Sequence, residues 1–246
     1  MPFAGTQGRL ALPGAAFSHY RRKSQQKATK ERAVDARVDI VVNGNKSVAD
    51  APFPSSLEAT LGPGMFAAAL REISSWPGYQ QTPLRHLTSL AGELGLADIA
   101  YKDEADRFGL GSFKALGGAY AVLRCLERAL RGAGITGPVT AADLTAGRYR
   151  DIVSGITVTS ATDGNHGRSV AWGAQSFGCN CVIFIHATVS EGRKSAIENF
   201  GASVRRCEGN YDDSVREAQE TASDEGWFVV SDTSYPGYME VPKDVM

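Results

Sequence analysis

The sequence predicts an α/β fold with a mostly parallel sheet and flanking helices. Strand-like and helix-like segments alternate from Leu96 onward with short links between them, and this order implies parallel strands joined by right-handed crossovers. The run Cys181–Ile185 is nearly continuous in apolar residues, which is typical of a parallel strand buried on both faces. Gly178 and Gly201 stand where helices are expected to stop. Ligands of such open sheets bind beyond the carboxyl ends of the strands.

Each element is expected from a local pattern. A helix over Met65–Trp76 has Phe66, Leu70 and Ile73 at three- to four-residue spacing, which gives it one apolar face. Thr188–Glu191 fits a capping box at the start of another helix. The other expected strands are Val38–Val42, Ile99–Lys102, Ile156–Thr159, Cys181–Ile185, Ser203–Arg206 and Trp227–Val230, and the other expected helices are Phe113–Arg131, Asn165–Phe177, the capped helix ending at Phe200, and Asp212–Glu225.

The composition is that of an ordinary globular protein. Of the 246 residues, 43% are hydrophobic and 22% are charged, and the length suffices for two modest domains or one large domain. The formal net charge of −1 argues against a nucleic-acid-binding surface. No apolar run approaches the about 20 residues that a membrane-spanning helix needs.

Two features bear on the cellular compartment. The four cysteines, at positions 125, 179, 181 and 207, lack CxxC spacing and predict neither a disulfide framework nor a zinc site. Reduced thiols suit an intracellular protein, and we expect a cytoplasmic one. Residues 1–36 have basic residues but no Asp or Glu before Glu31. That segment fits either a mitochondrial targeting peptide or a disordered extension.

The stretch Arg107–Ala121 carries the main candidate for chemistry. Its single lysine, Lys114, follows Ser112 and Phe113 and opens an expected helix. By residue type alone, such a lysine is most often solvated. The apolar and small neighbours of Lys114 favour a partly buried amine, and an amine removed from water is a better nucleophile. The functional alternative is therefore a lysine that holds pyridoxal phosphate as an imine.

A second stretch, Thr159–Gly167, favours the functional alternative. It reads TSATDGNHG and follows the apolar run Ile156–Val158. Together with SFKALGG around Lys114, it resembles the fold-type II pyridoxal-phosphate enzymes, the tryptophan synthase β and threonine dehydratase group. Within that group the sequence is most similar to diaminopropionate ammonia-lyase, through the RFGL of Arg107–Leu110 and through Asp163 before GNHG.

The resemblance spans the chain from about residue 79 to Met246 and includes a Tyr-x-x-Thr-Pro-Leu stretch at Tyr79–Leu84. It implies a tryptophan synthase β-like fold, in which residues 114–226 form a small α/β domain. Residues 37–113 plus 227–246 then form part of the large domain. The family continues past the position of Met246 with a glycine-rich loop that cradles the phosphate. We therefore expect an incomplete large domain and an isolated chain with weak or no cofactor binding.

The resemblance also assigns cofactor contacts. Lys114 forms the imine with pyridoxal phosphate, and Asn165 hydrogen-bonds the oxygen on the cofactor ring. Phe113, Gly164 and His166 are neighbours of these residues in the two stretches, and we expect them to contact the cofactor as well. Without the resemblance, Asn165 would be a turn residue between two glycines.

Two aspartates are expected to act on the substrate. Diaminopropionate carries a second ammonium on its β-carbon, which suits the carboxylate of Asp163. The resemblance suggests that Asp163 takes the α-proton of the D-isomer and Lys114 that of the L-isomer, while Asp232 helps to hold the second amine. From the residues alone, Asp163 equally fits a cap on the following helix, and Asp232 fits a turn after a strand.

The implied reaction is α,β-elimination of ammonia from 2,3-diaminopropionate to give pyruvate and a second ammonia, which needs acid–base groups rather than a metal. A serine or threonine dehydratase stays open, although Asp163 and the RFGL stretch argue against it. A non-catalytic remnant or interaction module also stays open, because a phosphate loop is not recognised. The expected partners are a small amino-acid substrate and, as the resemblance allows, a second copy in a homodimer, with neither nucleic acid nor membrane.

Overall fold

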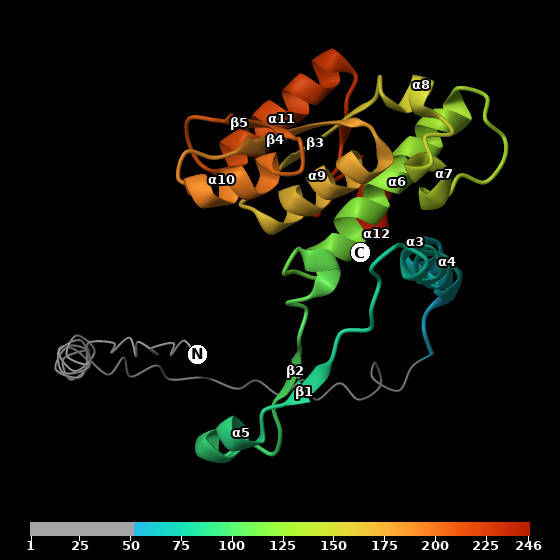
Figure 1. Cartoon of the computed structure of the whole chain (residues 1–246). Helices are drawn as coiled ribbons and strands as arrows, with labels where there is room; N and C mark the ends of the chain where they lie inside the picture. The colour runs from blue at the N-terminus through green and yellow to red at the C-terminus, as the bar shows by residue number, and fades with distance from the viewer. Residues whose placement is uncertain (1–51) are drawn as a thin grey trace, which may run out of the picture. The chain divides into compact units, whose positions relative to one another are not determined.

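The structure is a computed structural model and describes residues 52–246. A four-stranded parallel sheet is the central element of these residues. The expected strand Val38–Val42 and the segment 1–36 lie outside these residues. The parallel pairing confirms the mostly parallel sheet that the sequence predicts. The strands, in the spatial order β5-β4-β3-β6, are β3 (Thr157–Ala161), β4 (Asn180–Ile185), β5 (Ser203–Arg206) and β6 (Phe228–Val229) (Figure 1).

Helices cover both faces of this sheet. Ile183 and Ile185 of β4 are buried in a core shared with α6 and α9, which lie next to each other (Figure 1). The alternate residues Val182 and Phe184 are buried with α11. The strand is thus covered on both faces, as its apolar run predicts. The helices from the candidate lysine onward are α6 (Lys114–Gly132), α7 (Ala141–Thr145), α8 (Arg150–Val153), α9 (Asn165–Phe177), α10 (Glu191–Glu198), α11 (Tyr211–Glu225) and α12 (Glu240–Val245).

Small residues let other helices approach α6 closely. The backbone N–H of Ala119 donates to the Ser169 hydroxyl of α9 at 3.1 Å, and a Cβ on Gly118 would lie 2.4 Å from the same oxygen. A Cβ on Gly117 would lie 1.9 Å from the carbonyl oxygen of Val245 on α12. The two glycines therefore set how closely α9 and α12 pack on the helix that begins at the candidate lysine.

Gly117→Ala should lower the free energy of unfolding by about 1–3 kcal/mol, because the added methyl group forces α12 away from α6. Urea unfolding followed by circular dichroism measures this change. Gly132→Ala is the matched control at the end of the same helix, since a Cβ there meets no atom within 4 Å. Equal stabilities of the two variants would contradict the close contact between α6 and α12.

The segment before α6 is only partly as predicted. The helix expected at Met65–Trp76 is α4, whose Ile73 packs against the core while Phe66 and Leu70 are exposed. The strand expected at Ile99–Lys102 pairs antiparallel with β1 and does not join the parallel sheet. The division into small and large domains stays a prediction. The elements are α3 (Ser55–Leu61), α4 (Pro63–Ser74), β1 (Leu84–His86), α5 (Thr88–Leu94), β2 (Ala100–Lys102) and the 3-10 turn η1 (Arg107–Gly109).

Arg107 holds this segment together. Its side chain is 6% exposed and donates to the Glu104 carboxylate at 2.7 Å and to the Gln80 carbonyl oxygen at 2.6 Å. It also donates to the Thr82 hydroxyl at 3.0 Å and lies 5.4 Å from the centroid of the Tyr79 ring. The Tyr-x-x-Thr-Pro-Leu and RFGL stretches, separate motifs in the sequence, thus form one buried network ahead of the candidate lysine.

Two further predictions concern the cysteines and membrane segments. The four cysteines are free thiols, and three of them are buried, as expected for reduced thiols. Burial raises the pKa of Cys179 to about 12, so this thiol stays protonated. Within residues 52–246, none of the helices has both the length and the apolar character needed to cross a bilayer.

Candidate active site

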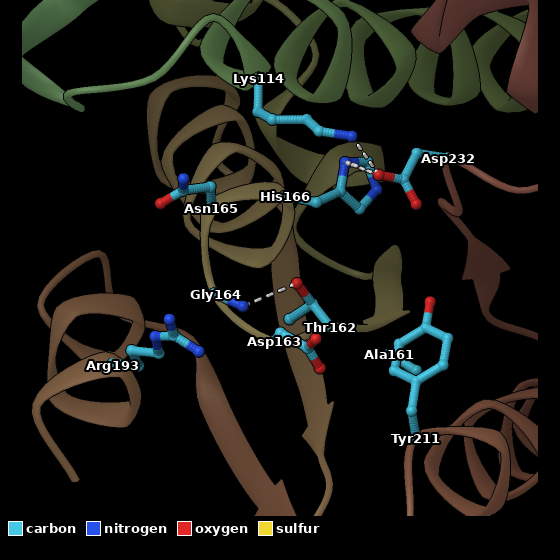
Figure 2. Close-up of a pocket in the computed structure, with 10 residues that line it drawn as sticks. All are labelled: Lys114, Ala161, Thr162, Asp163, Gly164, Asn165, His166, Arg193, Tyr211 and Asp232. Carbon is cyan, nitrogen blue, oxygen red and sulfur yellow. Dashed lines mark hydrogen bonds and ion pairs between the residues drawn. The ribbon is translucent and has the colours of Figure 1, made fainter. Parts of the chain in front are cut away.

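A cavity lies at the carboxyl edge of the sheet, where the strand order reverses. β6 comes last in the chain but pairs with β3, on the side opposite β4, and open parallel sheets bind ligands at such a switch point. The cavity measures ≈370 Å³, within the range of small-molecule sites. Its lining residues are Lys114, Ala161, Thr162, Asp163, Gly164, Asn165, His166, Arg193, Tyr211 and Asp232 (Figure 2).

Lys114 and Asp232 meet in this cavity. Lys114 is the first residue of α6, and its ammonium pairs with the Asp232 carboxylate (Figure 2). The lysine side chain is 31% exposed, so the amine is partly buried, as its neighbours predict. Tyr238 holds the segment that carries Asp232, because its hydroxyl donates to the Val229 carbonyl and accepts from the Ser231 N–H, each at 2.9 Å.

His166 is buried beside this ion pair. Its Nε2–H donates to the Val230 carbonyl at 2.9 Å, and its Nδ1, 4.0 Å from Asp232 Oδ2, has no hydrogen-bond partner among the described residues. Burial lowers the pKa of His166, against the opposing effect of Asp232. Burial would raise the pKa of Asp232, but His166 and Lys114 hold it below its usual range. Because the imidazole is neutral near pH 7, Lys114 supplies the positive charge.

Thr162 shapes the turn between β3 and α9. Its buried hydroxyl accepts hydrogen bonds from the backbone N–H groups of Gly164 at 3.1 Å and Gly167 at 3.2 Å. A Cβ on Gly167 would lie 2.4 Å from the Thr162 methyl, so the second glycine of GNHG permits this packing. No side chain caps α9 from its N-cap, Gly164. Thr162, rather than Asp163, binds the N–H of Gly167 in the first turn of α9.

Asp163 and Asn165 are the accessible polar residues of the turn. The Asp163 side chain is 62% exposed, and its Oδ1 accepts a hydrogen bond from His186 Nε2 at 2.9 Å. Its one ion-pair partner within residues 52–246 is this histidine. Asn165, the first residue of α9, is exposed. The carboxylate and the amide can both meet a ligand in the cavity.

Phe113 lies beside the cavity, in a groove that Lys114 and Asp232 also line. Phe113 is exposed and does not line the cavity. It lines a neighbouring apolar groove with Phe66 and Leu70, and the Lys114 amine lies 5.6 Å from its ring centroid. The expected site residues that do line the cavity are Lys114, Asp163, Gly164, Asn165, His166 and Asp232.

Sequence reasoning missed Thr162, Arg193 and Tyr211 as lining residues. Arg193 approaches the turn from α10, so that a Cβ on Gly164 would lie 3.6 Å from its Cδ. Tyr211 opens α11, and burial, followed by the charge of Asp232 and of neighbouring carboxylates, raises its pKa. Their positions after the expected strands could have identified them, because the loops that follow parallel strands meet at one edge of the sheet.

The lining residues fit pyridoxal phosphate. Lys114 supplies a partly buried amine, and the amide of Asn165 can reach a polar ring substituent. The buried Nδ1 of His166 is an acceptor without a partner among the described residues, directed at the Lys114–Asp232 pair.

These features define the class of the protein. A family profile described as "Pyridoxal-phosphate dependent enzyme" matches residues 75–245, well over half of the chain. The chain therefore belongs to the pyridoxal-phosphate-dependent enzyme family. This confirms the fold-type II architecture and the cofactor that the two sequence stretches predict.

Diaminopropionate ammonia-lyases are among its relatives. The chain is 39% identical over 170 residues to the enzyme of Salmonella typhimurium and 39% identical over 173 residues to that of Escherichia coli K12, with 69% of this chain covered in each case. The matches cover 42% and 41% of the two relatives. The chain thus spans less than half the length of these enzymes.

Solved structures give the same relationship. The Escherichia coli diaminopropionate ammonia-lyase in complex with D-serine matches with a TM-score of 0.68 at 36% identity, over 76% of this chain and 46% of that chain. A pyridoxal 5'-phosphate-dependent aspartate racemase, with a TM-score of 0.55 and 23% identity, shares the fold. These matches confirm that the chain is related to diaminopropionate ammonia-lyases, as the sequence motifs predict.

Proposed function

We propose that this chain acts in the pyridoxal-phosphate-dependent α,β-elimination of ammonia from 2,3-diaminopropionate. The observation that carries the proposal is one cavity in which Lys114 lies with two carboxylates, those of Asp163 and Asp232. Only Asp232 is paired with a lysine; Asp163 contacts His186. The diaminopropionate ammonia-lyases among the relatives support the choice of substrate.

The arrangement of charges suits a substrate with two ammonium groups. The accessible carboxylate of Asp163 can bind the β-ammonium, which would lose free energy if it left water without a counter-charge. The neutral β-hydroxyl of serine gains less from a carboxylate. The substrate carboxylate finds a cation in Arg193 and a positive helix end at the start of α9.

Pyridoxal phosphate, when bound, supplies an electron sink for the electron pair left at the substrate α-carbon. We assign to Lys114 the attachment of the cofactor and the α-proton of the L-isomer, and to Asp163 the α-proton of the D-isomer. Loss of this proton lets the C–N bond at Cβ break. The β-ammonium takes the electron pair of that bond and leaves as ammonia. Hydrolysis of the released 2-aminoacrylate then gives pyruvate and a second ammonia. Asp232, which pairs with the Lys114 ammonium, is proposed to help hold the second amine of the substrate.

A substrate panel tests this proposal. The full chain, mixed with pyridoxal phosphate, should form pyruvate from 2,3-diaminopropionate with a kcat/KM at least tenfold above that for serine. Threonine should give even less 2-oxobutanoate, because it lacks the β-ammonium and carries an extra methyl group on Cβ. A preference for serine or threonine would favour the dehydratase alternative. No turnover of any of the three would favour the non-catalytic interaction module.

Asp163→Asn should lower the turnover of D-2,3-diaminopropionate on the order of 10²–10⁴-fold, because the amide cannot accept the α-proton. The kcat for the L-isomer should stay within a few-fold of the wild type, since Lys114 takes that proton, while its KM should rise because the β-ammonium loses its counter-charge. Initial rates of pyruvate formation from the separate isomers, each measured over a range of concentrations, give both constants. Equal losses of kcat for the two isomers would contradict the division of roles between Asp163 and Lys114.

Assembly and compartment complete the proposal. The family resemblance supports a homodimer. The free thiols support a cytoplasmic location. Sedimentation of the purified chain tests the first, and fractionation of cells that express a tagged chain tests the second.

A further inference from the structure

His186 lies level with Asp163 at the edge of the sheet. β3 and β4 pair in parallel from Thr157↔Asn180 to Ala161↔Phe184. Continuing this register by two residues brings position 163 opposite position 186. Both residues therefore follow the carboxyl ends of neighbouring strands, and Asp163 lines the cavity.

The imidazole of His186 connects Asp163 to Thr188. Its Nε2 lies 2.9 Å from Asp163 Oδ1, and its Nδ1 lies 3.0 Å from the Thr188 hydroxyl. A carboxylate can only accept, so Nε2 carries the proton and donates it to Asp163. The Thr188 hydroxyl hydrogen-bonds Nδ1, which fixes the ring orientation. Both ring nitrogens are thus satisfied.

The backbone below the ring is also held in place. The Arg206 guanidinium donates to the carbonyl oxygens of His186 at 3.3 Å and of Ala187 at 2.9 Å, and it pairs with Glu191. Of the charged groups of the cavity, the carboxylate of Asp163 is the one in direct contact with the imidazole. The imidazole ring is therefore held in an orientation in which it hydrogen-bonds Asp163.

We propose that His186 is a positioning residue for Asp163. Its Nε2–H holds one carboxylate oxygen of the largely exposed aspartate, which restricts the side chain and leaves the other oxygen for the substrate. Misplacing a catalytic group by about 1 Å costs up to about 10²-fold in rate. The inference rests on the proposed function, in which Asp163 serves the D-isomer and Lys114 the L-isomer. His186 should therefore affect kcat for the D-isomer and leave kcat for the L-isomer unchanged.

The test compares three variants with both isomers of 2,3-diaminopropionate. His186→Leu should lower kcat for the D-isomer on the order of ten- to a hundredfold and leave kcat for the L-isomer within twofold. His186→Gln should restore most of the loss, because its amide can donate from near the place of Nε2. His86→Leu is the control, since His86 forms a similar pair with Asp98 at 2.9 Å outside the cavity and should affect neither isomer.

A second measurement needs neither turnover nor cofactor. In the chain labelled with ¹⁵N-histidine, Asp163→Asn should shift the ring signals of His186 and leave those of His86 unchanged. Unchanged His186 signals, or equal losses of kcat for both isomers in His186→Leu, would overturn this inference and leave the proposed function standing. A wild-type chain that turns over neither isomer would overturn the proposed function, and the inference with it.

Discussion

Lys114→Ala should reduce pyruvate formation from both isomers of 2,3-diaminopropionate by 10³-fold or more, an order of magnitude expected when a nucleophile and base is lost. Lys114 supplies the partly buried amine of the cavity, and its partner Asp232 cannot replace it. The same variant should lose the absorbance of the bound cofactor. Initial rates and visible spectra of the variant measure the two effects.

Lys194→Ala is the matched control for this variant. Its side chain is 29% exposed, close to the 31% of Lys114, and it pairs with Glu198 on the surface of α10. The control should keep the wild-type rate and spectrum. Activity retained in Lys114→Ala would move the cofactor to another lysine and contradict the assignment of the site.

Arg107→Met should lower the free energy of unfolding by about 3 kcal/mol, because it removes a buried cation and leaves its partners unpaired. The Arg107 hydrogen bond lowers the pKa of Glu104, against the effect of burial. A lowered carboxyl pKa stabilises the folded state above the unfolded value, 4.5, and this contribution is lost as the pH falls through the folded value. The stability of the variant should depend less on pH in that acid range. Urea unfolding at pH 7 and at about pH 4 measures both effects.

Arg85→Met provides the comparison for Arg107→Met. Arg85 pairs with Asp103 at 2.8 Å, but its side chain is 58% exposed. Exposed pairs contribute about 0–1 kcal/mol, so this variant should unfold almost as the wild type does. Similar losses in the two variants would mean that the buried network before Lys114 is not a special source of stability.

The order of strands and helices could be predicted from the sequence because each element is a local pattern. The bounds of α9 and β5 are those expected, since Gly178 follows the end of α9 and Gly201 separates β5 from the preceding helix. The capping box expected at Thr188–Glu191 is wrong. Ser190 caps α10 by accepting from the Arg193 N–H, and Thr188 contacts His186. Glu191 stands three residues after Thr188, so the motif points to Thr188, and only the backbone geometry identifies Ser190 as the N-cap.

The site could be predicted where a motif identifies a residue by itself. Lys114, Asp163 and Asp232 each follow from a short stretch, yet Lys114 and Asp232 lie 118 positions apart. Their contact depends on β6 returning to the free side of β3. The contact between Asp163 and His186 depends on the register of β3 and β4. Strand order and register result from packing of the whole sheet, so short motifs do not contain them.

The central claim is that this chain forms a pyridoxal-phosphate site at Lys114. Borohydride reduction of the purified full chain mixed with pyridoxal phosphate, followed by peptide mass mapping, tests it most directly. At a pyridoxal phosphate concentration high enough to offset the weak binding expected of the isolated chain, we expect one reduced pyridoxyl group per chain, confined to the peptide that contains Lys114. Adducts spread over many surface lysines, or none on the Lys114 peptide, would contradict the claim.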